Sequence, residues 1–186
     1  MILAWTAKTP TQCVVAVFAA TVCATLPGCA HHTVQPSVAH AGGPAMNFVA
    51  HDVEGHVVEL SDYIGHSAVL LDFCSTWCEP CVSELPHLRQ VYEKGKTRGL
   101  VVLAIALEAG EDRAKVPLWA RRHEVPFPVI FDEGGSIASF YNPRSLLPLK
   151  VLIDSEGYVT YIHYGYTLGD EQALDDAIAK AVARRG

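Results

Sequence analysis

The 186-residue sequence predicts an α/β protein in which helices layer a mixed β-sheet. Two apolar runs, residues 68–73 and 100–107, have the length and composition of strands that are buried on both faces. Stretches with helical signals lie between the strands, and the last two strands flank a tight turn ahead of a final helix. Alternating strands and helices predict parallel neighbours, whereas the closing hairpin predicts antiparallel ones.

The other elements follow from local signals along the chain. Four helices are expected, at 80–94, 112–123, 136–141 and 170–183. Four further strands are expected, at 57–60, 127–131, 150–154 and 158–164. Gly95 and Gly99 end the first helix, because glycine is favoured just beyond a helix C-terminus.

The charge balance excludes one class of partner. With 14 basic and 20 acidic residues, the formal net charge is −6. The basic residues form neither a stripe nor a patch interleaved with aromatic residues, so nucleic acid is not expected as a partner. An acidic balance of this size indicates solubility and little else.

The first 30 residues have the composition of an export signal. Lys8 is the only charged residue before His31, and residues 11–26 form the apolar run that follows a short basic segment in secretory signals. The run ends in the L-P-G-C sequence from Leu26 to Cys29, which resembles the lipobox of bacterial lipoproteins, so Cys29 is expected to carry lipid. The alternative is an uncleaved membrane anchor, because residues 9–30 are just long enough to span a bilayer. The Pro-Gly pair favours processing over a spanning helix.

Three segments are therefore expected: a signal peptide at 1–28, a flexible tether at 29–45 and one domain at 46–186. The tether is expected because its sequence lacks periodicity and is rich in proline, glycine and small residues. The lipid would hold the domain at a membrane, facing the periplasm or the cell exterior.

The six cysteines divide into two groups. Three lie in the expected signal and lipid site: Cys13, Cys23 and Cys29. The domain keeps three thiols in a short stretch: Cys74, Cys78 and Cys81. Three clustered thiols cannot build a disulfide framework, so a chemical role is the better interpretation.

The W-C-E-P-C sequence at 77–81 predicts a dithiol/disulfide redox centre. If Pro80 opens a helix, Cys78 lies at the N-terminus of that helix and Cys81 lies one turn further, close enough to form a disulfide. Free backbone N–H groups and the positive end of the helix dipole would stabilise a thiolate on Cys78. We expect an exposed Cys78 to attack and Cys81 to resolve the mixed disulfide. The alternative, a zinc site, lacks a second C-x-x-C, and His87 lies six residues beyond Cys81.

Motifs on both sides of this pair resemble those of one family. They are N-F-x-A-x-D-x-x-G at 47–55, L-S-D-Y-x-G at 60–65, L-L-D-F at 70–73, Pro86, and Leu147-Pro148 followed by V-L-I-D at 151–154. Together they are similar to the TlpA/ResA branch of the thioredoxin-like, AhpC/TSA-related proteins. The resemblance covers residues 46–184. It implies the thioredoxin fold, a central mixed β-sheet flanked by helices, with an N-terminal β-hairpin extension.

The resemblance assigns roles to individual residues. Asp72 matches the buried acid of thioredoxin, which relays a proton to or from Cys81. Glu84 matches an acid of ResA-like proteins, and a solvated helix residue is the alternative for it. Pro148 matches the cis-proline that places backbone against the cysteines, where substrate peptide can pair. Trp77 is expected beside the site, either packed in the core or in contact with partners.

Acidic residues near the pair predict the direction of electron flow. Asp72, Glu79 and Glu84 lie close to the cysteines in sequence or by the resemblance, and no basic residue or histidine occurs between Asp72 and Pro86. Negative charge disfavours a thiolate, so these acids should raise the pKa of Cys78 and make the couple less oxidising. A reductant is therefore expected. The residues expected to tune the couple are Trp77, Glu79 and Pro80.

A second interpretation starts from Cys74. Cys74 and Cys78 form C-x-x-x-C, which resembles the copper pair of Sco-type chaperones, and thiolates bind Cu(I). Those proteins supply a histidine just before the strand at 151–154, where this chain has Leu146, Leu147 and Pro148. A Cu(I)-binding or delivery protein is the alternative function. Otherwise Cys74 is a small buried side chain.

The sequence thus predicts a lipid-anchored, extracytoplasmic thiol–disulfide oxidoreductase that reduces disulfides in exported proteins. The Cys78–Cys81 pair would be its redox group, with no further cofactor and no metal. A thiol–disulfide protein of the membrane is expected to supply the electrons.

Overall fold

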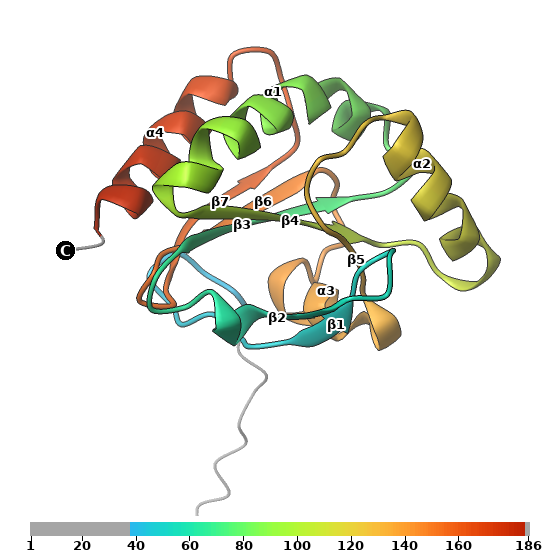
Figure 1. Ribbon diagram of the computed structural model, residues 1–186, viewed down its shortest axis with the longest axis horizontal. Coiled ribbons are helices and arrows are strands. Elements are labelled where there is room, and N and C mark those ends of the chain that lie inside the picture. Colours follow the sequence, from blue (N-terminus) through green and yellow to red (C-terminus); the bar gives the residue numbers. More distant parts are fainter. Residues whose placement is uncertain (1–37, 185–186) are drawn as a thin grey trace, which may run out of the picture. The chain divides into compact units, whose positions relative to one another are not determined.

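The computed structural model describes residues 38–184, in which helices lie on both faces of a five-stranded sheet (Figure 1). The predicted signal peptide (1–28) and the lipid site Cys29 lie outside the described residues, so both stay predictions. Within residues 38–184, no helix combines the length and apolar character needed to cross a membrane.

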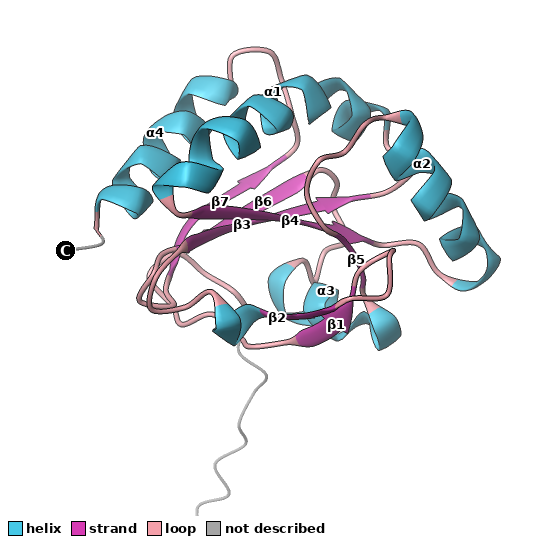
Figure 2. Cartoon of the chain, viewed as in Figure 1, coloured by secondary structure: helices cyan, strands magenta, loops and turns pink. Residues whose placement is uncertain are grey.

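The sheet has the strand order β5-β4-β3-β6-β7 (Figure 2). Its strands are β3 (Ala68–Cys74), β4 (Leu100–Ala106), β5 (Val129–Phe131), β6 (Leu149–Ile153) and β7 (Val159–Tyr164). The central strand β3 pairs in parallel with β4 and antiparallel with β6, so the sheet is mixed, as predicted. Every residue of β3 is buried, which explains why its sequence is an apolar run with a single acid.

Different elements cover the two faces of the sheet. One face lies under α1 (Glu79–Gly95), α2 (Val116–Arg122) and α4 (Glu171–Ala183) (Figure 1). The other lies under α3 (Ser136–Tyr141) and the N-terminal hairpin of β1 (Val49–His51) and β2 (Val57–Glu59). Side chains of β3 alternate between the faces, so Leu70 packs with α1 whereas Leu71 packs with the hairpin and α3. By the same alternation, Asp72 points to the face that α1 covers.

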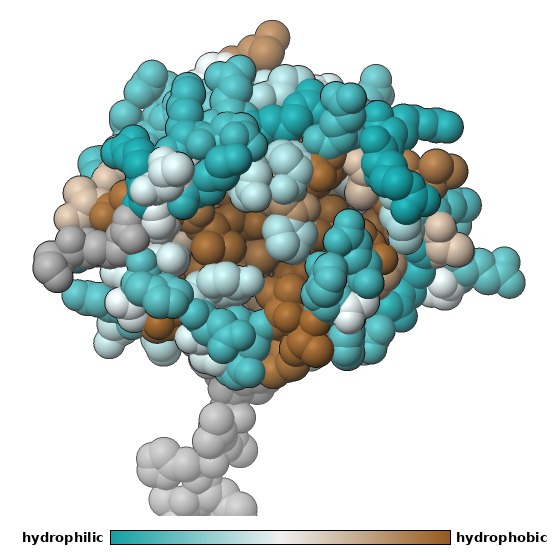
Figure 3. Space-filling view, viewed as in Figure 1, coloured by the Kyte–Doolittle hydropathy of each residue, from teal (hydrophilic) through white to brown (hydrophobic). Residues whose placement is uncertain are grey.

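The helical layer is amphipathic. In α1, Leu85, Leu88 and Val91 recur every three residues and are buried against the sheet. The outer surface of the layer is largely hydrophilic, and apolar side chains show between this layer and the hairpin (Figure 3). Burial of one apolar stripe per helix therefore joins the layers.

The predicted N-terminal hairpin is present. Strands β1 (Val49–His51) and β2 (Val57–Glu59) pair antiparallel around the expected Glu54-Gly55 turn. The Val53 N–H donates to the Val129 carbonyl (2.8 Å), so the hairpin attaches to the β5 edge of the sheet. This contact gives β5 a second neighbour.

The ordered domain begins earlier than predicted. Residues 38–45, expected to belong to the tether at 29–45, are bonded to the domain and pair with the start of β7. The Gly42 N–H donates to the Val159 carbonyl (2.7 Å), and the Val159 N–H donates back to the Gly43 carbonyl (2.9 Å). These bonds pair the exposed edge of β7, an interaction that the composition of the segment does not reveal.

Two predicted boundaries shift because of prolines. The helix expected at 112–123 starts as a 3₁₀-helix, Gly110–Lys115, and α2 begins at Val116. Pro117 occupies the first turn of α2, where its missing N–H leaves no bond unmade. The strand expected at 127–131 begins only at Val129, because Pro128 cannot donate to a ladder.

A buried tyrosine fastens the N-terminal segment to the core, and its removal should be measurable. The Tyr141 hydroxyl donates to the Met46 carbonyl (2.7 Å), and its ring is buried against Phe73. We expect Tyr141→Phe to lower the free energy of unfolding in urea by about 1 kcal/mol, because one hydrogen bond is lost while the ring stays. Tyr158→Phe, at an exposed ring, is the control. Equal stability of the two variants would contradict the assignment.

Candidate active site

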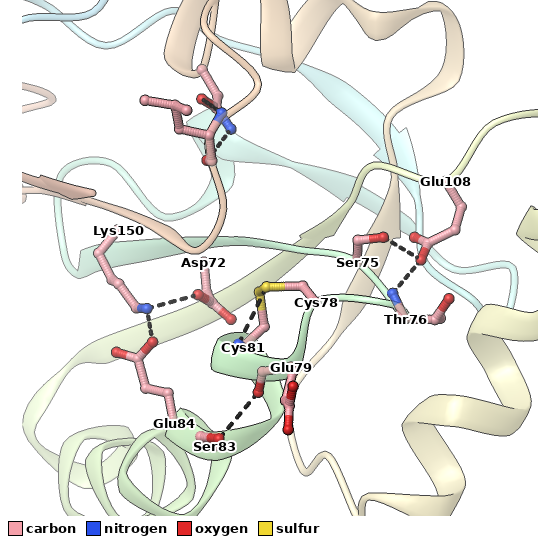
Figure 4. The surroundings of a disulfide bond; sticks show 12 residues. Asp72, Ser75, Thr76, Cys78, Glu79, Cys81, Ser83, Glu84, Glu108 and Lys150 are labelled. Carbon is pink, nitrogen blue, oxygen red and sulfur yellow. Dashed lines mark hydrogen bonds and ion pairs between the residues drawn. A yellow bond between two sulfur atoms is a disulfide. The ribbon is translucent and has the colours of Figure 1, made fainter. Parts of the chain in front are cut away.

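The two cysteines of the 77–81 motif are joined by a disulfide at the start of α1 (Figure 4). Their Cα atoms are 5.3 Å apart. Cys78 is the N-cap residue, and its Sγ accepts a hydrogen bond from the Cys81 N–H (3.3 Å). Pro80 lies in the first helical turn, where the sequence placed it. An N–H that already points at Cys78 Sγ would stabilise negative charge on this sulfur after reduction.

The exposure of the motif differs from the prediction. Cys78 was expected to be exposed, but in the disulfide it is only 4% exposed, and Cys81 is 3% exposed. Both belong to the apolar cluster between the sheet and α1. Trp77, by contrast, is 74% exposed, so it does not pack in the core. An indole ring in solvent beside the redox pair is available to partners.

Three buried charged side chains from three elements meet on the α1 face of the sheet (Figure 4). Asp72 on β3 and Lys150 on β6 are directly opposite in the antiparallel register. The Lys150 Nζ lies 3.6 Å from Asp72 Oδ1 and contacts Glu84 Oε2 more closely. Glu84 comes from α1, one turn after Cys81. Figure 4 shows the Lys150 ammonium pointing between the two carboxylates.

Burial dominates the protonation of this cluster. It raises the pKa of Asp72, and the Lys150 ammonium offsets part of the rise. Burial also lowers the pKa of Lys150, against the attraction of Asp72. When all three groups are ionised, two carboxylates and one ammonium leave one net negative charge. The cluster is therefore an acidic site that binds a proton more readily than a solvated carboxylate does.

Lys150 is the residue that the sequence analysis missed. The absence of a base between Asp72 and Pro86 is true of that stretch, but β6 brings a cation into the same space. The Lys150 ammonium therefore offsets part of the negative charge of Asp72 and Glu84. Their effect on the pKa of Cys78 is smaller than the sequence analysis predicted. A lone charge in the apolar run of β6 is the same signal that singled out Asp72, and it could have identified Lys150.

Glu84 and Glu79 have different surroundings. Glu84 is 4% exposed, so its interpretation as a solvated helix residue is wrong. Its carboxylate is buried because Lys150 is at hand as a partner. Glu79 is exposed at the start of α1, where water screens its charge. Of these two acids, Glu84 has the stronger influence on the interior.

A second buried acid, Glu108, fixes the loop that leads to Cys78. Its Oε1 accepts hydrogen bonds from the Ser75 hydroxyl (2.9 Å) and from the Thr76 N–H (Figure 4). Glu108 follows β4, so parallel pairing of β3 with β4 brings it to the carboxyl end of β3. The sequence analysis did not find this residue, because nothing local to it marks a contact 32 residues away.

Cys74 is a buried free thiol, 2% exposed. Burial, and then the charges of Asp72 and Glu108, raise the pKa of Cys74 well above its usual value. Cu(I) binds thiolates, so this environment counts against the copper pair of Cys74 and Cys78. The copper alternative stays a prediction. The other expectation, that Cys74 is a small buried side chain, agrees with its position in the core.

Among the residues that the structure describes, one group could hold a metal ion by the spacing of its ligand atoms: Asp52, Glu54 and His56 in the hairpin turn. It contains no cysteine. Hydrogen bonds within the turn already account for Asp52, whose Oδ1 accepts from the Glu54 and His56 N–H groups. These hydrogen bonds explain the arrangement of the three side chains as part of the turn, without a metal ion.

Pro148 follows a cis peptide bond with Leu147, as the resemblance implied. Leu147 packs against the apolar cluster that contains both cysteines. The Pro148 carbonyl accepts from the Gly165 N–H (2.8 Å), so it is already paired within the domain. Since proline has no N–H, a substrate peptide that paired with this loop would have to use the backbone of Leu147.

Fold and site together define a class of protein. A disulfide at the start of a helix, a central strand leading into it and a cis-proline loop before the next strand are the features of a thioredoxin-fold redox protein. The chain matches the AhpC/TSA family over residues 41–162. It belongs to that family, which confirms the predicted fold and family.

Named relatives support the predicted enzyme class. The chain is 40% identical over 118 residues to the thiol-disulfide oxidoreductase ResA of Bacillus thuringiensis, a match covering 63% of this chain and 66% of the relative. It is 35% identical over 129 residues to ResA of Halalkalibacterium halodurans, covering 69% and 71%. The chain thus spans about two thirds of the length of these relatives.

A solved structure gives the same result. A crystal structure from Chlorobium tepidum, described as a thiol:disulfide interchange protein DsbE, is 33% identical and superposes with a TM-score of 0.71. The match covers 77% of this chain and 99% of that chain.

The raised pKa of Asp72 makes a prediction about stability. A group whose pKa is raised by folding favours the folded state below its unfolded pKa, and this contribution is lost as pH rises through the folded pKa. Asp72→Asn removes the buried charge while Glu84 still pairs with Lys150. We expect this variant to exceed the wild type in free energy of unfolding by at least about 1 kcal/mol at pH 8, because the raised pKa of Asp72 destabilises the folded state once the carboxyl is ionised, and by much less near pH 4.

Urea unfolding at a series of pH values measures this difference. Asp62→Asn, at an exposed acid, is the control that should show no such trend. A wild type more stable than Asp72→Asn at pH 8 would contradict the account.

Proposed function

We propose that this chain is an extracytoplasmic thiol–disulfide oxidoreductase that reduces disulfides in exported proteins. The observation that carries the proposal is the Cys78–Cys81 disulfide at the N-terminus of α1, beside a buried carboxylate cluster. Relatives named as thiol-disulfide oxidoreductases support it.

Cys78 is the nucleophile in this proposal. Its thiolate attacks a client disulfide, so that a bond forms between Cys78 Sγ and one client sulfur while the other client sulfur leaves as a thiolate. The Cys81 N–H is aimed at Cys78 Sγ, and the helix N-terminus favours negative charge there. Cys81 lies further into the helix and serves as the resolving thiol.

The second step completes the transfer of two electrons. The Cys81 thiol gives up its proton, and its thiolate attacks Cys78 Sγ. The Cys78–Cys81 disulfide forms, the bond between Cys78 and the client breaks, and the second client sulfur leaves as a thiolate. Asp72 accepts the Cys81 proton, since burial raises its pKa and makes it a better proton acceptor than a solvated carboxylate.

The acids around the pair favour net reduction. When ionised, the cluster of Asp72, Glu84 and Lys150 beneath the disulfide carries a net charge of −1. This negative charge disfavours a thiolate on Cys78. A less stable thiolate makes the dithiol a better reductant. Lys150 reduces this influence without changing its sign.

The N-terminal segments support placement at a membrane. With residues 1–28 as a signal peptide and lipid on Cys29, only a short length of chain would separate the lipidated cysteine from residue 38, the first residue that the structure describes. The eight residues from 30 to 37 span at most ~28 Å. The oxidised pair would then receive electrons from a thiol–disulfide protein of the same membrane, and the client would meet the site through the exposed Trp77.

A trapping experiment tests the proposal. In Cys81→Ser, Cys78 can attack a client disulfide but the mixed disulfide cannot be resolved, so covalent adducts with exported proteins should accumulate. Non-reducing gels and mass spectrometry of extracts from cells that carry the tagged full chain measure these adducts. Reduction of the sample should release them.

Two matched variants control the experiment. Cys81→Ser combined with Cys78→Ser should trap nothing, and Cys81→Ser combined with Cys74→Ala should trap as much as Cys81→Ser alone. Adducts that depend equally on Cys74 would contradict the assignment of the reactive pair.

A further inference from the structure

Ionisable side chains form a row across the α1 face of the sheet. Asp72 on β3 pairs in register with Lys150 on β6, and Lys150 pairs with His163 on β7. Directly opposite residues of antiparallel neighbours project to the same face. The row therefore runs from the strand beneath the cysteines towards the sheet edge, where His163 Nε2 lies 3.2 Å from Asp170 Oδ2.

Lys150 is the one cation in the buried part of this row. Its side chain is 1% exposed, and the two carboxylates that it meets are nearly as deeply buried. The charged and titratable groups that surround the cluster from every packed element are Asp72 and Cys74 of β3, Glu84 of α1, Glu108 after β4, His163 of β7 and Asp170 before α4. All but His163 are acids or thiols, so the ionisation of Asp72 depends on Lys150.

The geometry aligns the carboxylate of Asp72 with both the cation and the redox pair. Asp72 shares a face of β3 with the apolar cluster that contains Cys78 and Cys81. In Figure 4 the Asp72 carboxylate is drawn between the Lys150 ammonium and the two cysteines. A proton leaving Cys81 therefore has a carboxylate on its own side of the sheet.

We propose that Lys150 is the positioning residue for proton transfer from Cys81: its ammonium keeps Asp72 ionised and oriented, so that the carboxylate can accept the proton of the resolving thiol. The inference rests on the proposed function, since it concerns the second step of that reaction.

The resolving step begins with the deprotonation of Cys81. The Cys81 S–H bond breaks and the proton bonds to an Asp72 oxygen. The Cys81 thiolate then forms the bond to Cys78 Sγ, and the bond between Cys78 and the client sulfur breaks. In this step Cys81 is oxidised and the client sulfur, which leaves as a thiolate, is reduced, while Cys78 stays at the disulfide level. Asp72 then returns its proton to solvent.

Loss of the ammonium has a specific consequence. Two buried carboxylates without a cation repel each other and lack water, so one of them takes up a proton. A protonated Asp72 cannot accept the proton of Cys81. The resolving step should then be slow near neutral pH and should recover at higher pH, where the acid ionises or hydroxide removes the thiol proton directly.

Single-turnover kinetics of the full chain test this inference, with oxidised glutathione as the disulfide probe. The reduced protein is mixed with the probe between pH 5 and 9 and quenched with acid, and mass spectrometry follows the Cys78–glutathione adduct. Formation of the adduct reports attack by Cys78, and its decay reports resolution by Cys81. In Lys150→Met we expect decay at pH 7 to be at least about tenfold slower, with a pH profile displaced upwards and with adduct formation little changed.

Matched variants separate a positioning role from a structural one. Lys150→Arg keeps the cation and should keep the wild-type pH profile, and His163→Gln should leave the profile in place. If Lys150→Met does not fold, Lys150→Gln carries the same test. A wild-type profile in the neutral variants, no rescue by arginine, or equal slowing of both steps would overturn the inference. A wild type that forms no adduct would instead contradict the proposed function.

Discussion

The contact of the Lys150 ammonium with Asp72 and Glu84 is the constraint on which the rest of the site depends. Removing an ion from water costs several kcal/mol, so buried charges are tolerated only where partners are in place. The register of β3 and β6 supplies one partner and α1 supplies the other. A shift of one residue between the strands would send Lys150 to the opposite face. Packing of the core and placement of charge are thus one requirement.

The two sulfurs of the redox pair meet different environments as a result. Cys78 caps α1 and receives the Cys81 N–H, so the helix end governs its thiolate. Cys81 lies over the face of the sheet that carries the buried carboxylates of Asp72 and Glu84. These carboxylates would control the loss of the proton from its thiol. Glu108 holds the loop before Cys78 from the other side. In the proposed reaction, attack by Cys78 and resolution by Cys81 would therefore have separate physical controls within one helical turn.

Local sequence signals identified the parts of the fold that local physics determines. The helix start at Pro80, the buried run of β3 and the terminal hairpin all follow from residues a few positions apart. The lone charge in the apolar run of β6 marks Lys150 locally, but its partners could not be identified from the sequence because they lie more than 60 residues away in the chain. Burial of Cys78 and the pairing of residues 42–43 with the start of β7 were missed for the same reason, since both depend on tertiary packing. The resemblance to a known family found Pro148, which no local pattern marks.

The reduction potential of the Cys78–Cys81 pair tests the central claim most directly, namely that a buried, net negative cluster makes this pair a reductant. The full chain is equilibrated in glutathione redox buffers, and the fraction of the Cys78–Cys81 disulfide is measured by mass spectrometry after acid quenching and alkylation. The account predicts a potential in the range of glutaredoxins and thioredoxin, roughly −200 to −270 mV. A potential near about −120 mV, that of a strong oxidant such as DsbA, would contradict it.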